Sequence, residues 1–201
     1  RCKRILMSND YYPALAQDHV EVINHGISSV DQSGLTDSTG THHDADVIIY
    51  GTGFKATDFL TPMTITGRDG ADLNAVWKDG AEAYLGITVR GFPNLFMLYG
   101  PNTNLGHNSI IYMLESQIHY ILQCVAQMDE QDIKALEVRD RVQDEFNKTV
   151  QDKISNTVWD KGCHSWYKTE SGKNTNNWPG FTFDYRRQTR TLDLSDYDLL
   201  R

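Results

Sequence analysis

The chain has 201 residues, 39% of them hydrophobic, which suffices for one compact core or for parts of two domains. Acidic side chains number 27 and basic ones 19, giving a formal charge of −8 that disfavours non-specific binding to nucleic acid. No apolar run of about 18 residues is present, so no transmembrane helix is predicted. Cys2, Cys124 and Cys163 lie far apart and predict free thiols in a reducing compartment, which favours a cytoplasmic location.

The sequence opens at Arg1 without an initiator methionine or a signal peptide. Basic residues lead directly into the apolar run 5–7, which is typical of a strand inside a fold. We therefore expect a fragment that lacks the N-terminal portion of the same protein. A deliberately shortened product is the alternative.

The first quarter of the chain is expected to hold short strands and turns. Its apolar and alternating patterns predict strands at residues 5–7, 20–23 and 27–30. Residues 10–16 predict a helical turn, in which a proline is tolerated near the start. The turn signals Ser33-Gly34 and Thr39-Gly40 predict a surface hairpin.

The segment Asp46–Phe54 carries the most informative pattern of the chain. The apolar residues after Asp46 predict a short strand covered on both faces, and this strand leads into Gly51-Thr52-Gly53. Glycine has no Cβ, so the backbone of such a turn can approach a ligand closely. An ordinary turn of an α/β protein is the alternative.

A second strand, predicted at residues 94–99, ends in the same way, in the glycine-containing turn 100–107. Two strands that end in glycine-rich turns indicate ligand contact at the carboxyl edge of a sheet. Residues 55–83 are rich in loop signals, with one helical turn near 73–77, and residues 86–89 predict a further strand.

Two amphipathic helices follow. Apolar residues within 109–128 recur at helical spacing and predict the longest element of the chain. They are Ile110, Met113, Leu114, Ile118, Ile121, Leu122 and Val125. We also predict a strand at 135–138, a charged helix at 139–155, and an irregular covering segment over 156–201.

The head of the long helix is a candidate site. Asn108 or Ser109 can cap the helix, and its first-turn N–H groups then favour an anion or a partially negative oxygen. His107 could contact a bound ring. A plain helix cap and a hydrogen-bonded structural histidine are the alternatives.

Other combinations of reactive side chains do not indicate a site. The run 42–46 contains possible metal ligands but fits no zinc spacing, and Cys163-His164 lacks a partner pair, so no metal is expected. No nucleophile elbow and no phosphate-binding loop occur. The aromatic run 161–168 could form a wall of a substrate site or a mobile loop, and packing of an irregular tail is the alternative.

Taken together, several spaced motifs resemble the flavin-containing monooxygenase superfamily, and most closely its Baeyer–Villiger monooxygenases. The resemblance covers essentially the whole chain. In chain order the motifs are Ser8–Leu15, Asp46–Phe54, Gly67–Leu73 with Trp77, Ala83–Gly86, Gly91–Phe96, Gly100–Thr103, Gly106–Ser109, Ser165–Tyr167 and Trp178–Gly180. Glu115, Gln117 and Tyr120 occupy positions where the family carries similar residues.

The resemblance implies an α/β fold that forms the C-terminal part of a flavoprotein with two Rossmann-like dinucleotide-binding domains, one for FAD and one for NADPH. NADPH would reduce the flavin, and O₂ would add at flavin C4a. The resulting peroxide would insert oxygen into a small-molecule ketone, or oxygenate a soft N or S nucleophile. The protein would supply orientation and electrostatics while the cofactor carries the chemistry.

The resemblance also implies domain boundaries and site residues. Residues 1–17 would end the NADPH domain and cross over, 18–128 would belong to the FAD domain, and 129–201 would form a helix and the covering segment. The residues expected at the flavin are Gly51, Thr52, Gly53, Asn102, Asn104, His107 and Asn108. Asp46 would be a hinge between domains, and Trp166 would lie on the substrate side.

The departures from the family pattern are as important. No GxGxxG fingerprint occurs, and the family's signature and catalytic arginine are absent, so the catalytic residues are expected upstream of Arg1. We therefore expect these residues alone to bind FAD weakly or not at all, and to be inactive. The alternatives are an N- or S-oxygenating relative, a disulfide-reductase-like enzyme, which the lack of a CxxC motif disfavours, and a non-catalytic fragment with a binding role.

Overall fold

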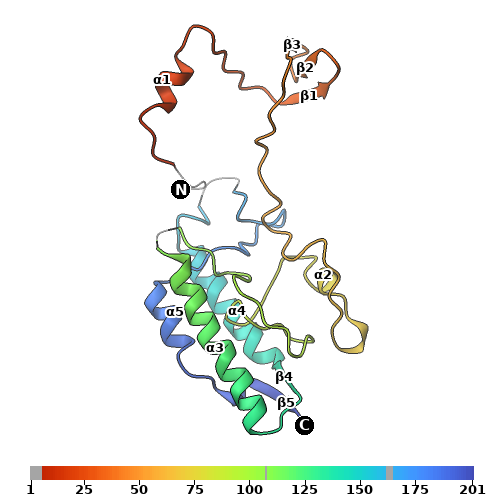
Figure 1. Cartoon of the computed structure of the whole chain (residues 1–201), viewed down its shortest axis with the longest axis vertical. Helices are drawn as coiled ribbons and strands as arrows, with labels where there is room; N and C mark the ends of the chain where they lie inside the picture. Colours follow the sequence, from red (N-terminus) through yellow and green to blue (C-terminus); the bar gives the residue numbers. More distant parts are fainter. Residues whose placement is uncertain (1–5, 107, 162–164) are drawn as a thin grey trace. The chain divides into compact units, whose positions relative to one another are not determined.

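The computed structural model describes residues 6–106, 108–161 and 165–201. Within these ranges the chain forms two compact units, one of residues 6–54 and one of residues 55–201 (Figure 1). The boundary at 54/55 lies inside the expected FAD domain of residues 18–128. The expected boundaries concern a longer protein and stay a prediction.

The unit of residues 6–54 contains a short helix, α1 (Tyr11–Leu15), and an antiparallel sheet of β1 (Ile27–Val30), β2 (Gly34–Asp37) and β3 (His42–Asp44) in that order. The predicted helical turn, the strand at 27–30 and the hairpin are thus confirmed. The β2–β3 turn is held by Asp37, whose Oδ1 accepts hydrogen bonds from the Thr39 hydroxyl at 2.5 Å and from the Thr39 N–H at 2.8 Å. These bonds, the hydroxyl first, hold the pKa of Asp37 well below its usual range.

The predicted strand at 46–50 is wrong: these residues belong to none of the described strands, and Ile49 is 90% exposed. Residues 20–23 and the described part of 5–7 are likewise not strands, and Ile5 lies outside the described residues. The physical reason is common to all three. An apolar run becomes a strand only when a neighbour accepts its backbone hydrogen bonds, and none of the described strands pairs with them.

The unit of residues 55–201 is built around two long helices, α3 (Ile110–Glu130) and α4 (Asp140–Ser155). The shorter α5 (Thr182–Gln188) lies beside α3, and β4 (Ala135–Val138) pairs antiparallel with β5 (Tyr197–Leu200) at one end of the helices (Figure 1). This unit also contains α2 (Leu73–Val76) and two 3-10 turns, Arg68–Gly70 and Leu194–Asp196. The predicted helices at 109–128 and 139–155 and the strand at 135–138 are confirmed.

α3 forms because its buried positions, Met113, Gln117, Tyr120 and Cys124, recur at helical spacing. It ends at Glu130, and Asp132 follows in the left-handed conformation with φ of 52°. α4 has Asp140 in its first turn and Lys153 in its last, as the helix dipole favours.

The core of this unit has three apolar clusters. One joins α3 to β4 and β5 through Tyr120, Cys124 and Tyr197, and another joins α3, α4 and α5 through Met113, Val150 and Tyr185. The third surrounds Leu73 and Trp77. Because all three helices contribute, the orientation of α3 is fixed by packing on several sides.

Two further strand predictions are wrong. Residues 86–89 form tight turns, with Leu85 and Gly86 both at positive φ, and only isolated bridges such as Tyr84 to Thr88 occur there. Residues 94–99 form no strand: Asn94 and Tyr99 have positive φ, and the segment makes single contacts such as Met97 N–H to the Ile87 carbonyl at 2.8 Å. The covering segment 156–201 is also more regular than predicted, since it contains α5 and β5. β5 pairs with a strand far away in sequence, which local pattern cannot reveal.

Candidate functional site

The segment 99–104, which precedes the long helix, is held in an unusual backbone conformation. Tyr99 and Asn102 both have positive φ, 58° and 57°. The Tyr99 N–H donates to Oε1 of Gln117 on α3 at 3.0 Å. Positive φ at residues other than glycine persists only where the surroundings enforce it. α3 therefore fixes the position of this segment directly.

Gln117 is itself fixed by a buried hydrogen-bond chain. Its side-chain amide donates to the Tyr185 hydroxyl at 3.0 Å, and that hydroxyl donates to the Leu85 carbonyl at 2.5 Å. Gln117 and Tyr185 are both fully buried. Burial raises the pKa of Tyr185 well above its ordinary value, so the hydroxyl keeps its proton and remains a donor. These hydrogen bonds link α3, α5 and the turn at Leu85 to the segment 99–104.

Asn102 is buried, with 2% of its surface exposed. Its side-chain amide donates to the Asn174 carbonyl at 2.9 Å and to the Asn177 carbonyl at 3.1 Å. Its backbone N–H donates to the Thr175 carbonyl at 2.8 Å. Asn102 thus attaches the segment 99–104 to residues 174–177, and its Oδ1 is a buried atom without a protein partner among the described residues.

Asn104 lies closer to the surface. Its backbone N–H donates to the Asn176 carbonyl and its carbonyl accepts from the Trp178 N–H, each at 2.9 Å. Its side-chain Oδ1 accepts from the Tyr99 hydroxyl at 2.8 Å. The backbone of Asn104 is therefore paired like a short strand, while its side chain is half-exposed.

The first turn of α3 has no side-chain cap. Ser109 is the N-cap residue, but its side chain makes no capping hydrogen bond. Asn108 instead accepts from the Ser109 N–H at 2.7 Å and donates to the Thr182 hydroxyl at 2.9 Å. The leading N–H groups of the helix carry its positive dipole end and are free of side-chain acceptors from the cap. His107 lies outside the described residues.

Trp166 is presented at the surface, with 49% of its surface exposed. Its ring lies against Tyr167, with centroids 4.4 Å apart, and Tyr167 is buried. The Tyr167 carbonyl accepts from the Asn176 side-chain amide at 3.3 Å. Residues 174–177 thus connect the surroundings of Trp166 to the segment 99–104.

The run Asn174-Thr175-Asn176-Asn177 was missed by sequence reasoning. All four residues are buried. Oδ1 of Asn174 accepts from the backbone N–H groups of Asn176 and Asn177 within the run, and all four backbone carbonyls accept hydrogen bonds from the segment 99–104. Polar composition suggested an irregular tail. Four small hydrogen-bonding residues in a row, beside Trp178, were the available signal of a buried polar network.

Gly51, Thr52, Gly53 and Asp46 belong to the unit of residues 6–54 and are exposed. Gly53 has φ of 86°, and a Cβ added at Gly51 or Gly53 would meet no atom within 4 Å. The backbone here is open to a close approach from outside. This turn and the segment 99–104 belong to different compact units, and their joint role stays a prediction.

Neither a metal nor a membrane is indicated by the described parts of the chain. No group of three or more His, Cys, Asp or Glu side chains suited to a metal ion occurs there. None of the helices found there is long and apolar enough to cross a bilayer. Cys163 and His164 lie outside the described residues.

No protein-family model matches the chain. A Baeyer–Villiger monooxygenase from Pseudomonas aeruginosa is 49% identical over 200 residues, and one from Streptomyces coelicolor is 45% identical over 209 residues. These alignments cover 98% and 100% of this chain. The chain spans only 38% and 39% of the length of those two relatives.

Solved structures of monooxygenases are also similar to this chain. Cyclohexanone monooxygenase from Rhodococcus sp. Phi1 bound to NADP⁺ matches with a TM-score of 0.87 and 27% identity, covering 99% of this chain and 39% of that one. A complex of OTEMO with FAD and NADP matches with a TM-score of 0.87 and 26% identity, covering 98% of this chain and 38% of that one. Over nearly all of its length, the chain is therefore similar to a C-terminal portion of Baeyer–Villiger monooxygenases.

Proposed function

We propose that this chain is part of an FAD- and NADPH-dependent monooxygenase that inserts one oxygen atom of O₂ into a ketone. The observation that carries the proposal is the 49% identity, over 98% of the chain, to a protein named Baeyer–Villiger monooxygenase. Two similar solved structures hold NADP, and one of them also holds FAD. When bound, the two cofactors supply the redox chemistry and the protein supplies orientation.

The residues of this chain fit a flavin at two places. The turn Gly51–Gly53 offers exposed backbone with a positive φ at Gly53, to which a flat ring system can come close. The uncapped N-terminus of α3 offers N–H groups that stabilise negative charge on a ring edge. We propose that Gly51, Thr52, Gly53, Asn104, His107 and Asn108 line the flavin.

Asn102 has a different role in this proposal. Its side-chain amide is consumed by two buried carbonyl groups, so it holds the segment 99–104 in place beside the ring instead of binding the ring with that amide. Correct placement matters because a small misplacement of a catalytic group is costly in rate. Trp166 then faces the substrate, and Asp46 serves as a hinge.

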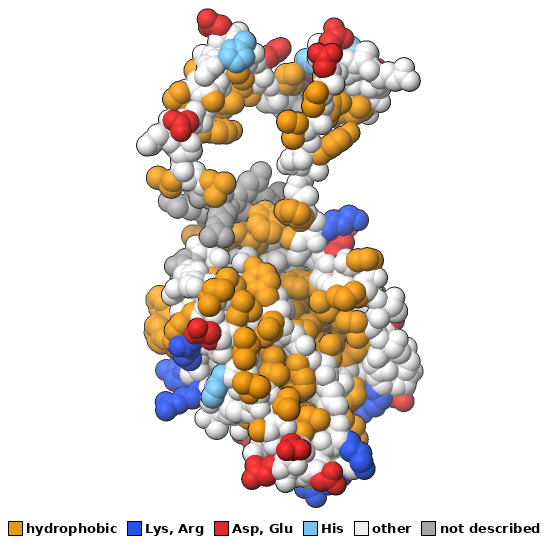
Figure 2. Space-filling view, viewed as in Figure 1, with side chains coloured by type: hydrophobic (Ala, Val, Ile, Leu, Met, Phe, Trp, Pro, Cys, Tyr) orange, Lys and Arg blue, Asp and Glu red, His pale blue; other side chains and the backbone are white. Residues whose placement is uncertain are grey.

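The rest of the proposed enzyme is the N-terminal portion of the same protein. The relatives are much longer than this chain, and the described residues contain no dinucleotide fingerprint. α3 has an exposed apolar face formed by Ile111, Ile118, Leu122 and Val125, visible as a hydrophobic band along the helix in Figure 2. We propose that this outer face of α3 packs against that portion, and that the whole enzyme resides in the cytoplasm.

Product analysis with the full-length protein tests the proposal. The purified protein would be incubated with NADPH, ¹⁸O₂ and either a cyclic ketone or an aryl methyl sulfide. We expect a lactone carrying one ¹⁸O atom and faster turnover of the ketone. Faster turnover of the sulfide would instead favour an S-oxygenating enzyme, and consumption of neither substrate would favour a non-catalytic binding role.

A further inference from the structure

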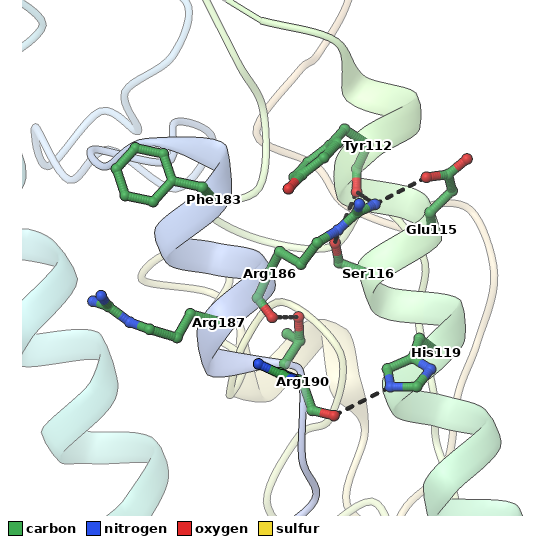
Figure 3. A pocket seen from close by; sticks show the side chains of 9 residues that line it. Tyr112, Glu115, Ser116, His119, Phe183, Arg186, Arg187 and Arg190 are labelled. Atoms are coloured by element: carbon green, nitrogen blue, oxygen red, sulfur yellow. Dashed lines mark hydrogen bonds and ion pairs between the residues drawn. The ribbon is translucent and has the colours of Figure 1, made fainter.

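A groove of about 570 Å³ lies between α3 on one side and α5 with the residues that follow it on the other (Figure 3). Tyr112 and His119 of α3 form one wall, and Phe183, Arg186 and Arg187 of α5 form the other, with Arg190 just beyond the helix. The groove belongs wholly to the unit of residues 55–201. None of its residues is used in the proposed flavin site.

The groove concentrates positive charge in an acidic chain. Three arginines fall within five residues, whereas the whole chain has a formal charge of −8. Two acidic side chains face them: Glu115 pairs with Arg186 at 2.9 Å, and Asp184 pairs with Arg187 at 2.9 Å. Among the described residues, no carboxylate pairs with the exposed Arg190.

Arg186 is a fixed part of the wall. Its guanidinium lies 3.4 Å from the centre of the Tyr112 ring, and its Nε donates to the Ser116 hydroxyl at 3.1 Å. Figure 3 shows this side chain reaching from α5 across to α3. With its charge compensated by Glu115 and its plane stacked on a ring, Arg186 organises the groove.

The end of the groove near Arg190 is also organised. His119 Nε2 donates to the Arg190 carbonyl at 3.1 Å, which fixes the ring and the turn after α5 (Figure 3). The Arg190 side chain therefore extends from an anchored backbone.

An apolar surface adjoins this charge. Phe183 is 58% exposed and stacks on Phe181, which is 63% exposed, with ring centroids 5.4 Å apart and planes at 11°. Two stacked and exposed phenylalanines are unfavourable in water unless something covers them. The combination of an uncompensated guanidinium and an exposed ring pair matches a ligand with an anionic head and an apolar body.

We propose that this groove binds a small organic anion in which a carboxylate or phosphate head is joined to an apolar body. Arg190 and Arg187 bind the head, and Phe183 contacts the body. The proposal does not depend on flavin chemistry.

Isothermal titration calorimetry of the full-length protein with 1-naphthyl phosphate and with 1-naphthoate tests the proposal. Inorganic phosphate supplies the head alone, and 1-naphthylmethanol supplies the body alone. We expect at least one of the two amphiphilic anions to bind about tenfold more tightly than either control. Inorganic phosphate lacks the apolar contact with Phe183, and 1-naphthylmethanol lacks the charge-assisted hydrogen bonds. The tighter of the two identifies the head group.

Variants locate the binding. Arg190→Gln is expected to weaken it about tenfold and Arg190→Lys less, because lysine keeps the charge but loses the planar fork. Phe183→Ala should weaken it as well. Arg141→Gln, at an exposed arginine of α4, is the matched control and should leave the affinity unchanged. The proposal is overturned if neither anion binds better than the controls, or if a folded Arg190→Gln variant binds as tightly as the wild type.

Discussion

At the scale of single residues, Cys124 shows how burial controls chemistry in this protein. Its side chain lies fully buried in the cluster that joins α3 to β4 and β5. Burial raises the pKa of the Cys124 thiol from 9.0 to about 12, because the thiolate cannot be solvated there. The folded protein therefore keeps this thiol protonated when an unfolded chain would already have lost the proton.

We predict that the free energy of unfolding falls as the pH rises from 9 to 12. The unfolded thiol releases its proton first, so rising pH favours the unfolded state, at no more than about 1.4 kcal/mol per pH unit for one group. Urea titrations at several pH values measure this slope. Cys124→Ala is the control, and its slope should be shallower because only the buried tyrosines remain. Equal slopes in both proteins would contradict the assignment.

At the scale of elements, Asn102 joins two segments that are far apart in sequence. Its side-chain amide holds residues 174–177 against the segment 99–104. Removing that amide leaves the buried Asn177 carbonyl without a donor, whereas the Asn174 carbonyl still accepts from the Gln151 side-chain amide at 2.9 Å. A buried polar group left unsatisfied costs about 1–3 kcal/mol. The same change releases the backbone conformation on which the proposed flavin contact depends.

We predict that Asn102→Gly, which tolerates the positive φ, lowers stability by about 1–3 kcal/mol. It should also speed hydrogen exchange of the Asn104 and Trp178 amides. Hydrogen-exchange mass spectrometry and urea unfolding are the measurements. Asp69→Gly is the matched control, because Asp69 also has positive φ, 55°, but an exposed side chain. If the two variants lose equal stability and show equal hydrogen exchange, the Asn102 side chain does not hold residues 174–177 against the segment 99–104.

The elements that could be predicted from sequence are those that depend on local pattern. α3 and α4 follow from helical spacing of their buried residues, and the β2–β3 turn from its Thr39-Gly40 signal. The predicted strand at 46–50 failed because an apolar run does not reveal whether a partner strand is present. β5 and the helix α5 were missed because such short segments acquire their structure from contacts with residues distant in sequence.

In the candidate site, too, only the features that depend on local sequence could be predicted. The open backbone at Gly53 was predicted from residue type alone, and the structure gives it a positive φ. The consumption of the Asn102 amide by residues 174–177 could not be predicted, because hydrogen-bond partners are set by the tertiary fold. The groove beside Arg190 was also missed, since its walls come from helices distant in sequence.

At the scale of the whole molecule, the outer face of α3 exposes Ile111, Ile118, Leu122 and Val125. A band of apolar side chains on one helix is typical of a contact surface. We predict that the 201-residue chain self-associates with rising concentration. Leu122→Lys should reduce this association, whereas in the full-length protein it should destabilise the fold, because the charge would become buried.

Sedimentation velocity of the chain and thermal unfolding of the full-length protein measure these two effects. Thr149→Lys adds the same charge on an exposed position of α4 and should change neither. A chain that remains monomeric at high concentration, together with a full-length Leu122→Lys protein of normal stability, would mean that this face contacts nothing.

We propose that the turn Gly51–Gly53 lies against FAD in the full-length enzyme. The most direct test is the flavin content per polypeptide of purified Gly53→Ala and Gly40→Ala proteins. The two glycines have nearly equal φ, 86° and 88°, and open space around both, so alanine strains the backbone equally. We predict that Gly53→Ala loses most of its flavin while Gly40→Ala retains it. Equal flavin content in the two variants would contradict the claim.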